Sequence, residues 1–207
     1  MNRGLLFGVI AMATIVVASN ILVQFLLGNW LTWGAFTYPF AFLVTDLMNR
    51  TYGVRQARKV VLAGFVIGVI SSLIGTQIML EFGPAVSLRI ALGSGMAFLL
   101  AQMSDVAVFD RLRAQSWWRA PLVSSFIGSA LDTALFFSIA FAAAFVFLDA
   151  SEPNAWAREV VPIFGFGPAA PLWVSLALAD FAVKMSLALV ALGPYRLAIS
   201  RLTPARA

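Results

Sequence analysis

Between Arg3 and Asp46 the chain has no charged residue, and most of that stretch is apolar. One helix needs about 20 residues to cross the hydrocarbon core of a bilayer, so the stretch is long enough for two crossings. Over the whole chain, hydrophobic residues make up 61% and charged residues 11%, whereas soluble domains have about 25% charged residues. The sequence therefore predicts an all-α, polytopic integral membrane protein.

We predict six transmembrane helices, at about residues 5–27, 31–48, 60–80, 88–109, 121–148 and 169–192. Pro39 lies within the second span, where its missing N–H and its ring would kink or interrupt a helix. The polar insert at 149–168 contains Pro and Gly, which predicts an external loop with a helical turn. No linker or low-complexity tract divides the chain, so we expect residues 1–207 to form a single integral membrane domain.

The basic residues are unevenly divided between the two sides of these spans. Segments on one side contain Arg3, Arg50, Arg55, Arg58, Lys59, Arg111, Arg113, Arg119, Arg196, Arg201 and Arg206, and segments on the other contain only Arg89 and Arg158. Loops rich in Lys and Arg lie in the cytoplasm, so we predict that both termini are cytoplasmic. The net charge of +5 is then a determinant of topology, and we expect no nucleic-acid partner.

The chain contains no cysteine and no histidine. It therefore lacks disulfides, thiolate metal ligands and the side chain that most often serves as a general base or metal ligand. We expect no metal site, no cofactor and no enzyme activity. In the third span, Gly64, Gly68 and Ser72 form a ridge of small residues that predicts close packing against another helix.

Charged side chains recur inside the predicted spans, where an ionised group at mid-bilayer costs about 2.5–3.5 kcal/mol on insertion scales. Such a group must be paired, face a wet cavity or bind a ligand. Polar and aromatic residues near these charges recur at steps of three or four, so each set forms one stripe along its helix. The four stripes are Tyr38, Phe42, Thr45 and Asn49; Ser94, Phe98, Gln102 and Asp105; Ser125, Gly128, Ser129, Asp132 and Phe136; and Trp173, Ala177, Asp180 and Lys184. We expect the stripes to converge on a central polar cavity.

Several of these charges have more than one interpretation. Asp180 and Lys184 are an i,i+4 pair, which either neutralises itself as a structural ion pair or takes part in binding. Asp46 and Arg50 have the same spacing near the interface, where a structural ion pair is favoured. Asp132 has no basic residue within a helical turn, so we predict that it faces a cavity or binds a ligand.

Two blocks of sequence resemble one known family. The first has YPF at 38–40, then TDLMNRTYG at 45–53 and ARKVV at 57–61. The second is RIALGSGMAFLLAQMSDVAVFDRLR at 89–113 followed by WWRAPLVSSFIGSALDTALFFSIAF at 117–141. Together they resemble the queuosine precursor transporters, once catalogued as vitamin uptake transporters, over roughly residues 30–200. The pattern departs at Arg50, where many members carry Glu, so no acidic role is transferred to that position.

This resemblance implies an importer of the bacterial cytoplasmic (inner) membrane that takes up 7-cyano-7-deazaguanine, 7-aminomethyl-7-deazaguanine or both for queuosine modification of tRNA. One carboxylate can accept both N–H groups of a guanine-like edge, which suits Asp132 or Asp180. Gln102 or Asn49 could donate to the O6 acceptor, and aromatic faces could stack on the planar base. The candidate substrate-binding set is Asp132, Asp180, Lys184, Gln102, Asp105, Asn49, Asp46, Phe42, Phe98, Phe136 and Trp173.

Other functions stay open on the residues alone. The cargo could be another small planar heterocycle or a vitamin, or the chain could be the substrate-binding subunit of an ATP-driven importer, since it has no GxxxxGK[ST] motif of its own. An intramembrane aspartate enzyme is the least favoured function, because it needs two deep aspartates within a few ångströms of each other. The expected partners are the 7-deazaguanine substrate and the lipid bilayer, and a homo-oligomer is left open.

Overall fold

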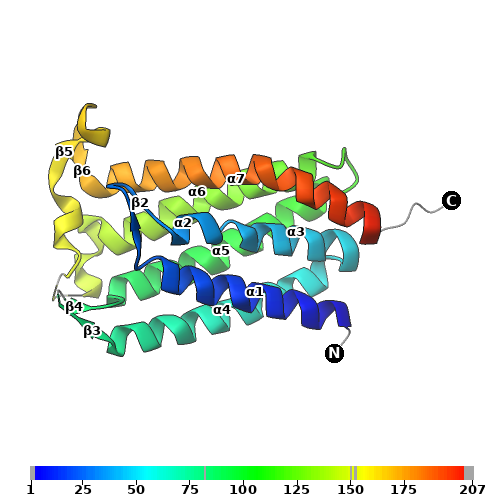
Figure 1. The fold of residues 1–207 in the computed structure, drawn as a ribbon, viewed down its shortest axis with the longest axis horizontal. Coiled ribbons are helices and arrows are strands. Elements are labelled where there is room, and N and C mark those ends of the chain that lie inside the picture. Colours follow the sequence, from blue (N-terminus) through cyan, green and yellow to red (C-terminus); the bar gives the residue numbers. More distant parts are fainter. Residues whose placement is uncertain (1–2, 82, 150, 152, 203–207) are drawn as a thin grey trace.

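The helices of the chain lie side by side along one long axis in the computed structural model, which describes residues 3–81, 83–149, 151 and 153–202 (Figure 1). The helices are α1 (Arg3–Leu22), α2 (Gly34–Thr37), α3 (Phe40–Tyr52), α4 (Val54–Gln77), α5 (Leu88–Leu112), α6 (Arg119–Phe141) and α7 (Leu172–Leu202). Among the described residues, α1, α4, α5, α6 and α7 are the five helices long and apolar enough to cross a membrane. The predicted all-helical, polytopic membrane architecture is confirmed at this level.

The second predicted span consists of two short helices, α2 and α3, with Tyr38 and Pro39 between them. Pro39 has no N–H to donate, which removes one hydrogen bond of a continuous helix. Both intervening residues keep right-handed helical dihedral angles, and Phe42 donates its backbone N–H to the Pro39 carbonyl at 3.2 Å. The predicted interruption at Pro39 is confirmed, and the chain continues in nearly the same direction across it (Figure 1).

Several predicted span ends were wrong at the end of the bundle opposite the termini. Short antiparallel strand pairs stand there: β1 (Leu26–Leu27) with β2 (Leu31–Thr32), β3 (Met79–Leu80) with β4 (Gly83–Pro84), and β5 (Val160–Pro162) with β6 (Ala169–Pro171). Gly28 and Gly83 have positive φ, which allows the tight reversals that end the helical segments before residues 27 and 80.

The fifth and sixth spans also differ from their predicted bounds. Helix α6 ends at Phe141 and is followed by the 3-10 segment η1 (Ala143–Leu148), because Ala142 is extended, with ψ 146°. The 149–168 insert has two further short 3-10 segments, η2 (Ala155–Arg158) and η3 (Ile163–Gly165), so the predicted helical turn is confirmed. Helix α7 continues past residue 192 to Leu202 with Pro194 inside it.

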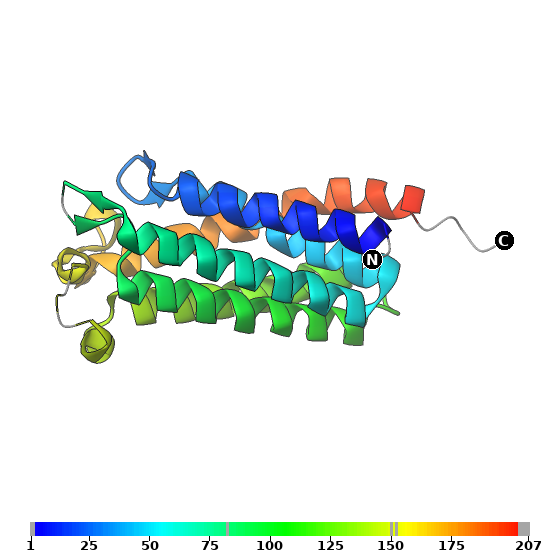
Figure 2. The same ribbon diagram turned by 90° about the horizontal axis from the view of Figure 1, so that it is seen from below.

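Small residues let α4 approach its neighbours closely, as predicted. A Cβ built on Gly64 would lie 2.5 Å from Met12 Cγ of α1 and 3.0 Å from Phe98 Cζ of α5. Met12 and Phe98 belong to the largest buried apolar cluster, which also includes Val60 and Val61 of α4. Helices α1, α4 and α5 therefore form one packed side of the bundle (Figure 2).

Helices α1 and α7 place both ends of the described chain at one end of the bundle (Figure 1). The connections from α3 to α4 and from α5 to α6 lie at that same end, and seven basic residues lie in them or in the adjoining helix ends: Arg50, Arg55, Arg58, Lys59, Arg111, Arg113 and Arg119. The strand pairs lie at the opposite end, near the basic residues Arg89 and Arg158.

Candidate functional site: a buried charge centre beside a cleft

A buried lysine on α7 binds two carboxylates in the middle of the bundle. Lys184 Nζ lies 2.6 Å from Asp132 Oδ2 of α6 and 2.5 Å from Asp180 Oδ2, one turn earlier on α7. The Lys184 and Asp132 side chains are only 4% and 7% exposed, so this ion pair is formed away from water. With all three groups ionised, the centre has a net charge of −1.

Two hydroxyl groups complete this centre. Tyr38, in the break between α2 and α3, donates its hydroxyl to Asp132 Oδ1 at 2.9 Å. Thr133 donates to Asp180 Oδ2 at 2.9 Å and accepts from Lys184 Nζ at 3.1 Å. The Lys184 ammonium also lies 5.5 Å from the centre of the Tyr38 ring, within range of a cation–π contact. The helix break thus brings a ring and a hydroxyl onto the ion pair.

A second polar cluster lies between α3, α5 and α6. Thr45 donates to Gln102 Oε1 at 3.0 Å and lies 3.4 Å from Asp105 Oδ2, while Ser124 donates to Asp46 Oδ1 at 3.3 Å. These residues are at most 3% exposed, and no Lys or Arg forms an ion pair with either acid within the described part of the chain.

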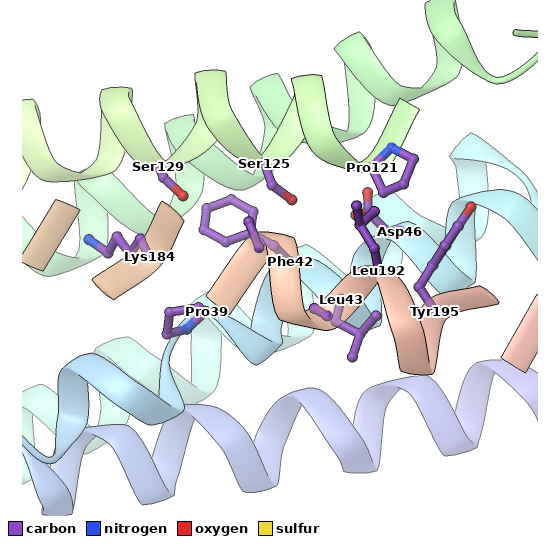
Figure 3. Close-up of a pocket in the computed structure, with 12 residues that line it drawn as sticks. Pro39, Phe42, Leu43, Asp46, Pro121, Ser125, Ser129, Lys184, Leu192 and Tyr195 are labelled. Atoms are coloured by element: carbon purple, nitrogen blue, oxygen red, sulfur yellow. The ribbon is translucent and has the colours of Figure 1, made fainter. Parts of the chain in front are cut away.

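A cleft connects the two polar clusters along α3, α6 and α7 (Figure 3). Its empty space is about 350 Å³, including its open mouth. Figure 3 shows Lys184 toward one end of the cleft, with Asp46 and Tyr195 toward the other. The lining residues are Pro39, Phe42, Leu43, Asp46, Pro121, Ser125, Ser129, Lys184, Ala188, Ala191, Leu192 and Tyr195.

A second cleft, with about 340 Å³ of empty space, lies on the other side of Tyr38 between α1, α4 and α5. Phe98 lines it together with Asn20, Ser72 and Ser94. The Tyr38 ring contacts Phe98 edge-on at 6.2 Å and Phe42 at 6.3 Å between ring centres. Tyr38 therefore lines the second cleft and contacts Phe42, which lines the first.

Not every predicted site residue lies at these clefts. Phe136 packs against Phe137 and Phe141, and Trp173 contacts the same aromatic cluster. Asn49 is fully buried and donates to the Val106 carbonyl at 2.9 Å, so its amide serves the contact between α3 and α5.

The charge pairing differs from the prediction in two ways. Asp132 was expected to lack a basic partner, yet Lys184 reaches it from another helix, a contact that spacing along one helix does not reveal. The Asp180–Lys184 ion pair is confirmed, although Lys184 is shared. The expected pair of Asp46 with Arg50 was wrong within the described residues, because Arg50 donates to the Tyr195 hydroxyl at 3.0 Å and to the Arg113 carbonyl at 2.5 Å.

Sequence reasoning missed three residues that touch these clusters. Thr133 directly follows Asp132 and so lies outside the periodic stripe. Ser124 contacts Asp46 although only its neighbour Ser125 fell on the stripe. Tyr195 was missed because the sixth span was predicted to end at residue 192, and extending that helix past Pro194 would have found it.

The chemistry of the centre suits polar, neutral ligands. Lys184 supplies donors, and Asp132 and Asp180 supply acceptors. Among the described residues, no group of three or more acids that could hold a metal ion is present.

Comparison with known proteins agrees with this geometry. A family model described as "Putative vitamin uptake transporter" matches residues 32–198. The "Queuosine precursor transporter" of Escherichia coli (strain K12) is 36% identical over 191 residues, which cover 85% of this chain and 77% of that protein. The "Probable queuosine precursor transporter" of Haemophilus influenzae is 42% identical over 122 residues, or 53% of this chain and 52% of that protein.

A relative from Bacillus subtilis (strain 168), also named "Probable queuosine precursor transporter", is 26% identical over 198 residues, or 86% of this chain and 76% of that protein. No solved structure matches the chain.

The long apolar helices around a buried charge centre define a multi-pass transport protein of the bacterial cytoplasmic membrane. The chain belongs to the queuosine precursor transporter family, whose family model carries the vitamin uptake description.

Proposed function

We propose that this protein imports queuosine precursors, 7-cyano-7-deazaguanine or 7-aminomethyl-7-deazaguanine, across the cytoplasmic membrane. The observation that carries the proposal is Lys184, which lines a cleft and holds two carboxylates, Asp132 and Asp180, at its ammonium group in a member of this family. The names of the relatives support the substrate class.

Recognition proceeds by exchange of partners at Lys184. The edge of a 7-deazaguanine has an O6 acceptor beside an N1–H and an exocyclic amine. When the base enters, Lys184 donates to O6 and one carboxylate, Asp132 or Asp180, accepts the two N–H groups. The other carboxylate keeps its contact with Lys184, so the lysine stays paired, and the N–H groups of the base satisfy the carboxylate that is released. Charge-assisted bonds of this kind are about twice as strong as neutral ones.

Aromatic rings hold the plane of the base. Phe42 lines the first cleft, and Tyr38 lines the second and contacts Phe42. Stacking of a base on such a ring is worth about 1–3 kcal/mol. Of the predicted aromatic set, we retain Phe42 and Phe98 for this role, because Phe136 and Trp173 pack in a separate cluster.

The path follows the two clefts. The one lined by Asn20, Ser72 and Ser94 lies toward the strand-pair end, and the one lined by Asp46 and Tyr195 toward the end with both termini. We infer six crossings, counting α2 and α3 as one, with both termini in the cytoplasm. The basic residues gathered at the terminal end support this orientation, and substrate then passes Tyr38 on its way inward.

The proposal is tested in cells that cannot make queuosine precursors but retain the later tRNA modification enzymes. Supplying 7-cyano-7-deazaguanine should restore modified tRNA only when this protein is expressed. Equal recovery without the protein would contradict the substrate assignment. A vitamin as cargo would be indicated instead if this protein restored growth of a vitamin-uptake mutant but not modified tRNA.

The same cells test the site. Asp132→Asn turns one acceptor of the carboxylate into a donor, so uptake should fall at least tenfold at equal membrane abundance. Asp110→Asn is the matched control, because Asp110 is 39% exposed in its side chain and pairs with Arg113 away from both clefts. Near wild-type uptake by Asp132→Asn would remove Asp132 from the site and leave Asp180 as the recognising carboxylate.

A further inference from the structure

The pair formed by Asp46 and Asp105 has no role in the recognition of a base described above. Asp105 is fully buried and Asp46 is 3% exposed, and each accepts a hydrogen bond from a hydroxyl group, that of Thr45 and that of Ser124 respectively. A buried carboxyl group without a cation is costly in its ionised form and takes up a proton instead. The burial of both acids therefore implies that the pair holds a proton.

Among the described residues, no Lys or Arg forms an ion pair with Asp46 or Asp105 that would make this proton unnecessary. Its direct polar contacts are hydroxyl groups, from Ser124 to Asp46 and from Thr45 to Asp105. Asp105 Oδ1 and Gln102 Nε2 are buried without a hydrogen-bond partner. The pair is thus incompletely satisfied, and gain or loss of a proton changes its hydrogen bonding directly.

Charged and titratable groups on every neighbouring helix are already engaged or exposed. They are Arg50 and Tyr52 on α3; Arg55, Arg58 and Lys59 on α4; Arg89, Asp110, Arg111 and Arg113 on α5; Arg119 and Asp132 on α6; and Asp180, Lys184, Tyr195, Arg196 and Arg201 on α7. Arg50 binds Tyr195 and the Arg113 carbonyl, Asp110 pairs with Arg113, and Asp132 pairs with Lys184. The basic residues of α4 are exposed.

The pair also has access to the cleft. Asp46 lines the same cleft as Lys184 (Figure 3), whereas Asp105 lies behind it, on α5. A Cβ built on Gly128 of α6 would lie 2.7 Å from Phe42 and 3.3 Å from Asp105 Cβ, so the cleft-lining ring and the acid meet at one glycine. A change in the cleft is therefore transmitted to the pair through direct contacts.

We propose that Asp46 and Asp105 form a proton-binding site that couples inward proton movement to substrate movement through the cleft. The proposal rests on the function proposed above. One of the two acids holds a proton while the pair is reached from outside, and the proton is released to the cytoplasm through the cleft when the contacts of Tyr195 at its inner end open. Substrate and proton then move in the same direction, and no covalent bond other than that to the proton forms or breaks.

The test uses the purified full chain in proteoliposomes with labelled 7-cyano-7-deazaguanine. Counterflow at equal pH on both sides measures carrier function without a gradient, and uptake with an acidic outside measures coupling. Wild type should accumulate substrate under the gradient and lose that accumulation with a protonophore. Uptake is normalised to counterflow for each variant. In Asp105→Asn and Asp46→Asn, normalised uptake with the gradient should equal normalised uptake without it. Asp110→Asn should keep the wild-type increase.

Infrared spectroscopy observes the proton without any substrate. The C=O band of a protonated carboxylic acid should be present in wild type and in Asp110→Asn, and it should be lost in both Asp46→Asn and Asp105→Asn. An unchanged band in both Asn variants would overturn the proton site. Counterflow without gradient-driven accumulation in wild type would overturn the coupling alone, and absence of counterflow would overturn the proposed substrate and the coupling with it.

Discussion

Lys184 is the residue on which the buried charges most depend, because it is the cation shared by Asp132 and Asp180. Spacing along α7 predicted its contact with Asp180, one turn away. The contact with Asp132 could not be predicted, because the two residues are 52 positions apart and meet only when α6 packs on α7. Sequence periodicity identifies which residues share a helix face. Which faces contact each other depends on how the helices are arranged in the bundle.

Lys184→Gln should be the most destabilising change at this centre. It leaves two carboxylates side by side without their cation, and breaking a buried pair costs about 3–5 kcal/mol. Asp180→Asn should cost less, because Asp132 keeps its contact with Lys184 at 2.6 Å. Thermal unfolding of the purified proteins in detergent checks this order, with the exposed Lys59→Gln as control. Equal melting temperatures for Lys184→Gln and wild type would contradict the assigned ion pairs.

Close packing between helices occurs at small residues, and these can be recognised in the sequence. The ridge on α4 predicted a close approach, and the break at Pro39 predicted that the second span would be interrupted. The strand pairs at the span ends were not predicted, because strands of two or three residues are too short to show alternation along the sequence. Hydropathy alone assigned their apolar residues to the membrane helices.

Gly64→Ala should destabilise the contact of α4 with α1 and α5. The added methyl group would overlap Met12 and Phe98, and overpacking of a core costs about 1–3 kcal/mol. Gly95→Ala, on α5, is the matched control, because its methyl group would lie 3.7 Å from the nearest atom and a helix gains about 0.5–1 kcal/mol from the same replacement. The melting temperature should therefore fall for Gly64→Ala and hold or rise for Gly95→Ala. The opposite order would contradict the packing.

At the scale of the whole molecule, the termini and the basic connections share one end of the bundle (Figure 1). That arrangement supports the six crossings proposed above, in which α2 and α3 together make one. The charge distribution along the sequence predicts the same topology. A topology of this kind is predicted from sums of charge and hydropathy along the sequence, whereas the site depends on individual contacts between helices.

Reporter fusions test this topology directly. A reporter active only in the cytoplasm should work when fused after Arg3, within 49–59 or after Leu202, and it should fail within the 149–168 insert. The reason is that basic segments are retained in the cytoplasm, and only Arg158 lies in that insert. A second reporter, active only outside the cytoplasm, should give the reverse pattern and serves as the control. Activity of the cytoplasmic reporter at residue 155 would mean that α2 and α3 do not cross the membrane together, and the cleft containing Asp46 and Lys184 would then need a different assignment of sides.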